Sequence, residues 1–434
     1  MVWGGNDNAV EKWVKQLTED DPNLTSLHIL SMRRLSQDDL KSIFSALTHN
    51  THLKVLYCSG HAIEQEAMDQ LSEALTLNDT LETLNIGNSD LGQYGDLLRI
   101  FAEGLAVNEG LLHLDFENKG IDDTALSVLA PALIKNTTLR SLNLARNAIT
   151  RILDEPSSLE HIQSLNMSGN KIDAEGARHL ATRLTHLEEL DVSNNPLMEG
   201  ASAMTAALAN NTRLQSLKMM GVTTLDEGEE QEETGDATHG NPLMQHLAQS
   251  LKTNTTLKRV WLDRNGIESQ ALETLNQSLG HSSVTELRLR NNKVDNQGAT
   301  WLAQTTHDAG RRIHLDLGSN AIGYEGFGAL LDTSFIHHLG LFNNKINGLP
   351  ELLPELKKSG VESLDIGCNE ITLDDLEAIV TVLVQDGVPH LRLLEMGGNA
   401  KEEEMEVWEA TITRLQEKRE ALEVAWKRFI QEQQ

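Results

Sequence analysis

One eleven-residue pattern recurs along this chain and constrains its fold more than any other feature. Its clearest copy is LRSLNLARNAI at residues 139–149, with apolar residues at offsets 1, 4, 6 and 11 and an asparagine at offset 9. Leu142 and Leu144 indicate a short strand, because residues two apart on a strand point to the same face. Asn147 then follows at a turn, where its amide can satisfy backbone groups that lack partners. Units of this kind bury their apolar residues only by stacking, so the pattern predicts a solenoid.

The pattern occurs in 14 copies, spaced 23 to 30 residues apart except for one spacing of 43 residues. The copies begin at Leu24, Leu53, Leu81, Leu111, Leu139, Ile162, Leu187, Leu214, Leu257, Val284, Arg312, Ile336, Val361 and Leu391. The first four copies lack the asparagine and carry Met32, His61, Ser89 and Lys119 instead. The N-terminal third of the array is therefore degenerate.

The segments between the predicted strands indicate helices. Ser36 precedes QDDLKSIFSAL as a helix N-cap, and residues 122–136, 174–184 and 374–384 carry apolar residues at helical spacing. Several helices end in a recurring Asn-Thr motif, as at Asn78 and Asn136. Asparagine tolerates the left-handed conformation that ends a helix, so we expect these residues to be caps rather than glycosylation sites.

A strand, a turn and a full helix of about 28 residues that ends in N-x-T-L resemble the ribonuclease-inhibitor-like class of leucine-rich repeats. The resemblance covers about residues 24–400. It implies an α/β solenoid shaped as a right-handed horseshoe, with an inner parallel sheet and outer helices. The chain departs from ribonuclease inhibitor in having only two cysteines, Cys58 and Cys368, and in its shorter repeats.

The two ends of the chain predict helical caps. Residues 1–23 contain AVEKWVKQL, whose apolar face can cover the open edge of the first repeat. Residues 401–434 place apolar residues in alternating steps of three and four, which indicates a long amphipathic helix with a heptad seam. That seam consists of Met405, Trp408, Ile412, Leu415, Arg419, Leu422, Trp426 and Phe429. Two interpretations stay open: a cap on the last repeat, or a coiled-coil arm for self-association or a second partner through Trp408, Ile412, Leu415, Leu422 and Trp426.

An acidic insertion explains the one long spacing. Residues 222–241 read VTTLDEGEEQEETGDATHGN, with seven acidic residues and no Lys or Arg. This composition is typical of a disordered surface loop. The simplest interpretation is a tolerated insertion. The alternative is that the loop folds over a neighbouring basic surface and competes with an acidic partner.

Composition narrows the classes of partner and compartment. The net charge of −29 repels phosphate backbones, so nucleic acid is not an expected partner. Cys58 and Cys368 lie about eleven repeats apart and cannot form a bridge within one solenoid, which favours a reducing, cytoplasmic location. No signal-peptide pattern and no apolar run of membrane-spanning length occurs in the sequence.

The candidate binding residues lie on the predicted concave face, where strand side chains point away from the core. Copies eight to ten form a basic patch around an exposed tryptophan on an otherwise acidic protein. The patch consists of Lys218, Lys258, Arg259, Trp261, Arg264, Arg288 and Arg290. Trp and Arg are enriched at interface hot spots, whereas the alternative is that the ring only packs against its basic neighbours. We therefore expect a protein partner, and an acidic surface on that partner would complement the patch.

No catalytic constellation is present. The sequence has no nucleophile elbow, no phosphate-binding glycine loop and no CxxC pair, and we expect no cofactor and no metal. The prediction is a non-catalytic scaffold that binds a protein on its concave face. The alternatives are a GTPase-activating protein, since the Ran GTPase activator shares this repeat class, and an immune-type sensor or host-targeted effector.

Overall fold

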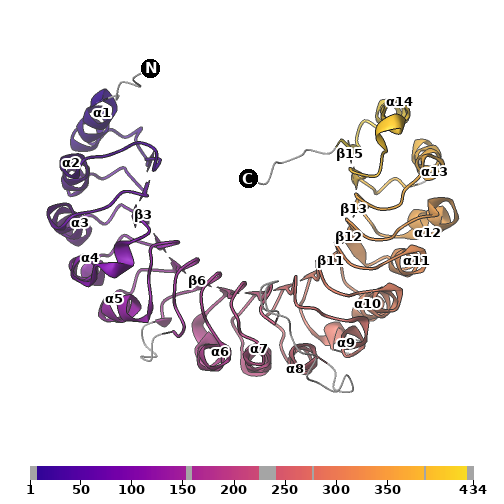
Figure 1. Cartoon of the computed structure of the whole chain (residues 1–434), viewed down its shortest axis with the longest axis horizontal. Helices are drawn as coiled ribbons and strands as arrows, with labels where there is room; N and C mark the ends of the chain where they lie inside the picture. Colours follow the sequence, from indigo (N-terminus) through magenta and orange to yellow (C-terminus); the bar gives the residue numbers. More distant parts are fainter. Residues whose placement is uncertain (1–6, 153–158, 224–240, 276–277, 386–387, 428–434) are drawn as a thin grey trace. The chain divides into compact units, whose positions relative to one another are not determined.

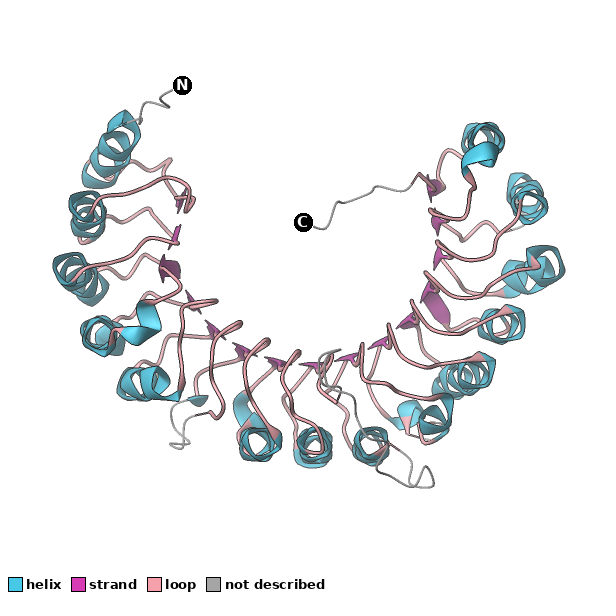
Figure 2. Ribbon diagram, in the orientation of Figure 1, coloured by secondary structure: helices cyan, strands magenta, loops and turns pink. Residues whose placement is uncertain are grey.

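The computed structural model describes residues 7–152, 159–223, 241–275, 278–385 and 388–427 of the chain (Figure 1). The chain forms two compact units, residues 1–200 and residues 201–434. In each unit the strands line one side and the helices line the other (Figure 2). We call the side of the sheet that turns away from the helices the open face; it corresponds to the concave face expected from the sequence.

Unit 1 is a parallel sheet whose strands follow one another in chain order. Its described strands are β1 (Ser26–His28), β2 (Val55–Ser59), β3 (Thr83–Gly87), β4 (His113–Asp115), β5 (Ser141–Asn143), β6 (Ser164–Asn166) and β7 (Glu189–Asp191). Its described helices are α1 (Asp7–Thr18), α2 (Gln37–Leu47), α3 (Gln65–Leu77), α4 (Gly95–Val107), α5 (Asp123–Lys135) and α6 (Ala174–Ala181). Ser36 caps α2 through a capping box with Asp39, as expected.

Unit 2 repeats the same arrangement. Its described strands are β8 (Ser216–Lys218), β9 (Arg259–Trp261), β10 (Glu286–Arg288), β11 (Ile313–Asp316), β12 (Ile336–Gly340), β13 (Ser363–Asp365), β14 (Leu393–Glu395) and β15 (Glu423–Ala425). Its described helices are α7 (Gly200–Ala207), α8 (Pro242–Leu251), α9 (Ser269–Glu273), α10 (Asn296–Ala309), α11 (Tyr324–Leu331), α12 (Leu353–Lys358), α13 (Leu373–Val384) and α14 (Met405–Lys418). The predicted fold class, an α/β leucine-rich-repeat solenoid, is confirmed.

The core of each repeat is a layer of aliphatic side chains between strand and helix. Leu142 and Leu144, at offsets 4 and 6 of the clearest copy, are both buried, and the same offsets are buried throughout the array. Each layer needs its neighbour to exclude water, which is why the repeats stack. Cys58 occupies one of these positions, and burial raises the pKa of its thiol to about 12, so it behaves as a small apolar residue.

The asparagine at offset 9 joins adjacent repeats at the turn. Asn170 donates from Nδ2 to the carbonyl oxygens of Leu144 and Met167, both at 2.9 Å, and its Oδ1 accepts from the Ile149 amide at 3.0 Å. One side chain thus satisfies backbone groups of two repeats, as the sequence pattern predicts.

The Asn-Thr motifs form a second ladder, and the prediction of a left-handed cap is wrong. Asn78 ends α3 with φ −95° and ψ 119°, which is extended backbone. Its Nδ2 donates to the carbonyl oxygens of Leu47 and Asn50, and its Oδ1 accepts from the amides of Thr80 and Leu81. The asparagine is needed for its side chain, which joins the helix ends of successive repeats, and not for its backbone.

The eleventh copy departs from the predicted register by one residue. Arg312, taken from the sequence as its first apolar position, has an exposed side chain, and Ile313 is buried in its place. In the pairing of β11 with β12, Ile313 lies opposite Ile336 and His314 lies opposite His338, so the additional residue, His337, is on β12. Leu315 returns to the expected core position.

The prediction of one continuous helix over residues 401–434 is wrong within the described residues. The helix α14 ends at Lys418, the chain turns, and β15 pairs in parallel with β14. The Arg419 guanidinium, the polar break in the heptad seam, donates to the backbone oxygens of Leu383, Val388 and Leu391 and so ties the turn to the preceding repeat. Phe429 lies outside the described residues.

The apolar residues proposed for self-association are buried inside this last repeat. Trp408, Ile412 and Leu415 have no exposed surface, and Leu422 and Trp426 are buried as well. The rings of Trp408 and Trp426 stack with their centroids 6.4 Å apart. These side chains complete the core and do not present a coiled-coil seam, which corrects the self-association expectation for these residues.

Candidate protein-binding face

The open face of unit 2 is built by side-chain alternation along its short strands. On β9 the middle residue, Val260, is buried, whereas Arg259 and Trp261 on either side of it are half-buried and belong to the open face. Parallel register then places the equivalent residues of successive strands side by side. The central row is Lys218, Trp261, Arg288, Asp316, Gly340, Asp365, Glu395 and Ala425.

Trp261 is held in place by both neighbouring strands. The Lys218 ammonium lies 4.2 Å from the centroid of the indole ring and the Arg288 guanidinium lies 4.3 Å from it. These two cations come from β8 and β10, the strands that pair with β9, so both neighbours of β9 contribute a cation to the ring. The indole Nε1 donates to Glu286 Oε1 at 2.7 Å. The ring is therefore half-buried and fixed, and not freely exposed as the sequence suggested.

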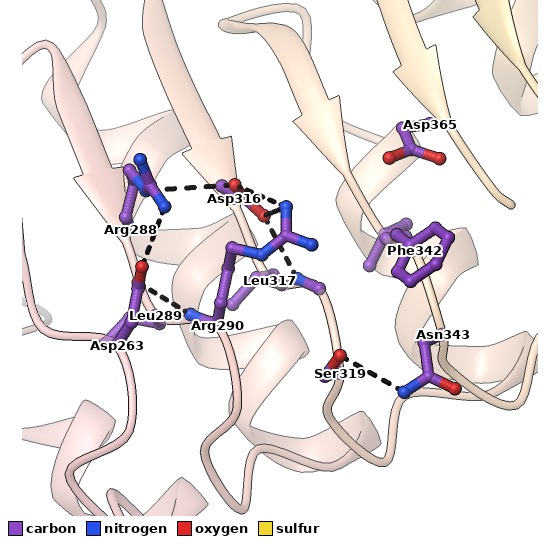
Figure 3. Close-up of polar contacts among 12 residues, drawn as sticks. Asp263, Arg288, Leu289, Arg290, Asp316, Leu317, Ser319, Phe342, Asn343 and Asp365 are labelled. Carbon is purple, nitrogen blue, oxygen red and sulfur yellow. Dashed lines mark hydrogen bonds and ion pairs between the residues drawn. The ribbon is translucent and has the colours of Figure 1, made fainter. Parts of the chain in front are cut away.

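Two arginines of the patch are neutralised by carboxylates of the same face. Arg288 pairs with Asp263 at 2.8 Å, and Arg290 pairs with Asp316 at 3.2 Å, while Arg288 Nε also approaches Asp316 at 3.9 Å (Figure 3). Burial raises the pKa of Asp263, and the Arg288 guanidinium opposes that rise. The predicted basic patch is thus partly an ion-pair network.

Two glycines on neighbouring repeats allow the charged side chains of this network to approach the backbone closely. A Cβ at Gly318 would lie 3.0 Å from the guanidinium carbon of Arg290, and a Cβ at Gly340 would lie 2.8 Å from Asp316 Oδ1. Each charged side chain therefore leans over the next strand, where no side chain blocks it.

The structure brings some of the predicted residues together and separates others. Lys218, Trp261, Arg288 and Arg290 form one connected group, which we call the basic–aromatic cluster. Lys258 lies exposed at the strand entry and donates to Gln215 Oε1 at 3.0 Å. Arg259 is half-buried beside Trp261, and Arg264 is exposed at the strand exit in a left-handed conformation, with φ 57°.

Three acidic members of the network were not predicted from the sequence. Asp263, Glu286 and Asp316 all occupy offsets that point away from the core. When neighbouring copies are aligned by offset, Glu286 lies opposite Arg259 and Asp316 lies opposite Arg288. The opposite charges at these aligned offsets could therefore have indicated the network from the sequence. Among the described residues, no group of three or more His, Cys, Asp and Glu side chains could hold a metal ion.

Comparison with known proteins agrees with this repeat architecture. The profile described as "Leucine Rich repeat" matches residues 135–150, 158–181, 183–204, 313–331 and 361–380. Ribonuclease inhibitor of Sus scrofa is 26% identical over 332 residues, which cover 71% of this chain and 67% of that protein. Together with the repeat geometry, these matches support a leucine-rich repeat protein of the ribonuclease-inhibitor-like class.

Other relatives share part of the array. Protein CARMIL of Dictyostelium discoideum is 25% identical over 382 residues, 81% of this chain, and the chain spans about a third, 34%, of the length of that protein. A protein phosphatase 1 regulatory subunit 37 homolog of Caenorhabditis briggsae is 25% identical over 145 residues, 32% of this chain and 15% of that protein. Within the described residues, no helix combines the length and apolar character needed to cross a membrane.

Proposed function

We propose that this leucine-rich repeat protein binds another protein on the open face of unit 2, at the basic–aromatic cluster, and has no catalytic activity of its own. The observation that carries the proposal is the fixed position of Trp261 between Lys218 and Arg288, with its N–H bonded to Glu286. An aromatic ring that is already ordered loses little conformational entropy when a partner covers it.

The chemistry of the cluster also favours a protein partner. Tryptophan and arginine dominate interface hot spots, and charged groups around them give orientation and specificity. Asp263 and Asp316 hold the two guanidinium groups in defined positions, so the cluster offers a partner a rigid pattern of charges. Rigid presentation suits a solenoid, whose repeats contact mainly their neighbours.

The names of two relatives support a regulatory role without catalysis. One is called an inhibitor of ribonuclease and one a regulatory subunit of a phosphatase, so both are named for their action on another protein. We extend that kind of role to this chain, together with the cytoplasmic location predicted from the sequence.

The proposal is tested by affinity capture with the full chain and with the variants Trp261→Ala and Lys218→Ala. A partner that binds the wild type should bind Trp261→Ala about 30-fold more weakly, since a hot-spot residue contributes roughly 2 kcal/mol. Charge reversal at Arg288 is avoided, because a carboxylate there would face Asp263 and Asp316 and disturb the fold.

Trp301 provides the matched control. It is a half-buried tryptophan on α10, on the helical side of unit 2. Trp301→Ala should leave binding unchanged. If all partners bind Trp261→Ala and wild type equally, with both proteins folded, the open face of unit 2 is not the binding site.

A further inference from the structure

The open face of unit 2 changes charge along its length. At its first strands, two lysines lack acidic partners among the described residues. Lys218 packs on the Trp261 ring, and Lys258 donates to the neutral side chain of Gln215. This end of the face therefore carries surplus positive charge from these two residues.

The middle of the face neutralises itself. Arg288 and Arg290 on and after β10 pair with Asp263 and Asp316, so two cations meet two carboxylates. The pairs are partly desolvated, because the Asp263 side chain is only 7% exposed and that of Asp316 only 13%. These pairs give the middle of the face charges in fixed positions, but no surplus of either sign.

The last strands carry surplus negative charge. Asp365 on β13 and Glu395 on β14 are side by side in register, and both are half-buried. In the part of the chain that the structure describes, neither carboxylate forms an ion pair with a Lys, Arg or His side chain. Burial raises the pKa of both groups, and the Asp365 charge raises that of Glu395 further. The Arg290 guanidinium opposes the rise at Asp365, but no described cation forms an ion pair with either carboxylate, so both stay desolvated with little compensation.

The surface beside these carboxylates is shallow and has an aromatic border. Gly340 leaves the central row without a side chain between Asp316 and Asp365. A Cβ at Gly367 would lie 3.0 Å from the Phe342 ring, so the half-buried ring rests against backbone at that point. Figure 3 shows the Phe342 ring, which follows β12, near the Asp365 carboxylate at the end of β13.

We propose that this face docks one partner segment of opposed charge, with its acidic end over Lys218 and Lys258 and a Lys or Arg side chain beside Phe342, Asp365 and Glu395. The inference rests on the proposed function and adds the chemistry of the partner. The Arg290 guanidinium carbon already lies 5.9 Å from the centroid of the Phe342 ring. A partner cation would lie beside that ring and pair with both carboxylates. Four strand spacings separate β9 from β13, which is about 19 Å, or about 13 residues of helix.

The test places a photo-crosslinking amino acid in the full chain at Gln215, near the basic end, or at Ser363, near the acidic end. Both side chains are half-buried on or beside the open face. The crosslinked partner peptides are identified from cell lysate by mass spectrometry. The expected result is one partner captured from both positions, with surplus acidic residues in peptides from position 215 and surplus basic residues in peptides from position 363.

Variants of the acidic end sharpen the test. Asp365→Asn with Glu395→Gln should lower capture from position 363 at least tenfold. The Asn can keep the hydrogen bond that the Gly367 amide donates to Asp365 Oδ1 at 2.9 Å. The control variant, Glu402→Gln with Glu403→Gln, removes the same charge from exposed residues just before α14 and should leave capture unchanged.

The outcomes separate the two proposals. Capture of a partner from both positions without charge sorting, or capture that the Asp365→Asn/Glu395→Gln variant does not reduce, overturns the inference and leaves the proposed function standing. Absence of any partner that Trp261→Ala weakens overturns the proposed function itself. A crosslinker at Glu406, on the helical side beside other acidic residues, shows how much basic peptide an acidic surface collects without specificity.

Discussion

The Nζ atom of Lys119 lies 2.6 Å from Ser59 Oγ, although 60 residues separate them in the sequence. The same ammonium donates to the Gly87 carbonyl oxygen at 2.9 Å, and the Lys119 residue is only 1% exposed. Lys119 occupies offset 9, where later copies have asparagine. Its long side chain therefore connects the turns of three successive repeats in the region that lacks the asparagine ladder.

Replacing Lys119 should loosen these three repeats. Lys119→Ala removes the donor of the half-buried Ser59 hydroxyl and of the buried Gly87 carbonyl, and it removes buried methylene groups. We therefore expect the free energy of local unfolding to fall by about 2 kcal/mol. Because a solenoid can open locally, the appropriate measurement is amide hydrogen exchange of β2, β3 and β4.

The control for this prediction is Lys41, which forms an exposed ion pair with Glu66 at 2.6 Å on the helical side of unit 1. Lys41→Ala should change the free energy of local opening, measured by hydrogen exchange, by less than about 0.5 kcal/mol. Equal effects of the two substitutions would mean that the buried lysine does not hold the turns together.

Much of the fold could be predicted from the sequence, because the apolar positions that define the repeat are the residues that form the core. The strand positions, the central row of the open face and the asparagine ladder at the turn all follow from the offsets. The second ladder was missed because an asparagine at a helix end has two possible uses, through its backbone or through its side chain. Only contacts with the previous repeat, such as that of Asn78 with Leu47, distinguish them.

The C-terminal segment could not be predicted from its periodicity. A heptad seam indicates which side chains are buried, but it does not indicate which part of the structure they pack against. Trp408 and Trp426 meet because the chain turns after Lys418, and nothing in the spacing marks that turn except the polar residue Arg419.

The sequence predicted which residues lie in the candidate site, but it did not predict that acidic neighbours neutralise part of their charge. Counting Lys and Arg suggested a basic patch, but the carboxylates that pair with them lie on neighbouring strands, about 25 residues away in sequence. The acidic insertion, residues 222–241, lies almost wholly outside the described residues, so its contact with the cluster stays a prediction.

Deleting residues 226–236 tests that prediction. If the insertion competes with an acidic partner segment for the basic end, its removal should strengthen partner binding several-fold and reduce the dependence of binding on salt. The dissociation constant measured at low and high salt, for wild type and deletion, checks both effects. No change in either quantity would mean that the insertion is a tolerated surface loop.

Truncating Trp408 tests the role of the last repeat. Trp408→Ala removes a fully buried ring from the contact between α14 and β15, so we expect a loss of about 3–5 kcal/mol in the stability of that repeat. Molecular mass measured by light scattering over a range of concentrations should be the same for wild type and variant.

Val407 gives the matched control, because its side chain is 49% exposed on the same helix. Val407→Ala should lower the stability of the last repeat by less than about 0.5 kcal/mol. A concentration-dependent mass in the wild type that Trp408→Ala abolishes, with the fold retained, would restore the coiled-coil interpretation.

Neutralising the acidic end of the open face should stabilise the protein at pH 7. The pKa values of Asp365 and Glu395 are raised by burial, so between their unfolded and folded pKa values the folded state binds more protons than the unfolded state. The free energy of unfolding therefore falls as pH rises through that window and stays lower above it. Asp365→Asn with Glu395→Gln removes this loss. The free energy of unfolding of the variant should therefore be higher than that of wild type at pH 7 and equal to it below about pH 4.

Glu377 provides a control of opposite sign. Its hydrogen bond from Arg414, at 2.6 Å, lowers the pKa of the carboxyl group, so its contribution is present at neutral pH and is lost as pH falls. Glu377→Gln should therefore slightly destabilise the protein at pH 7, by an amount that screening keeps small. Urea denaturation across pH 4 to 8 measures both variants. If Asp365→Asn/Glu395→Gln also destabilises at pH 7, these carboxylates support the fold, and a partner cation is not needed to explain them.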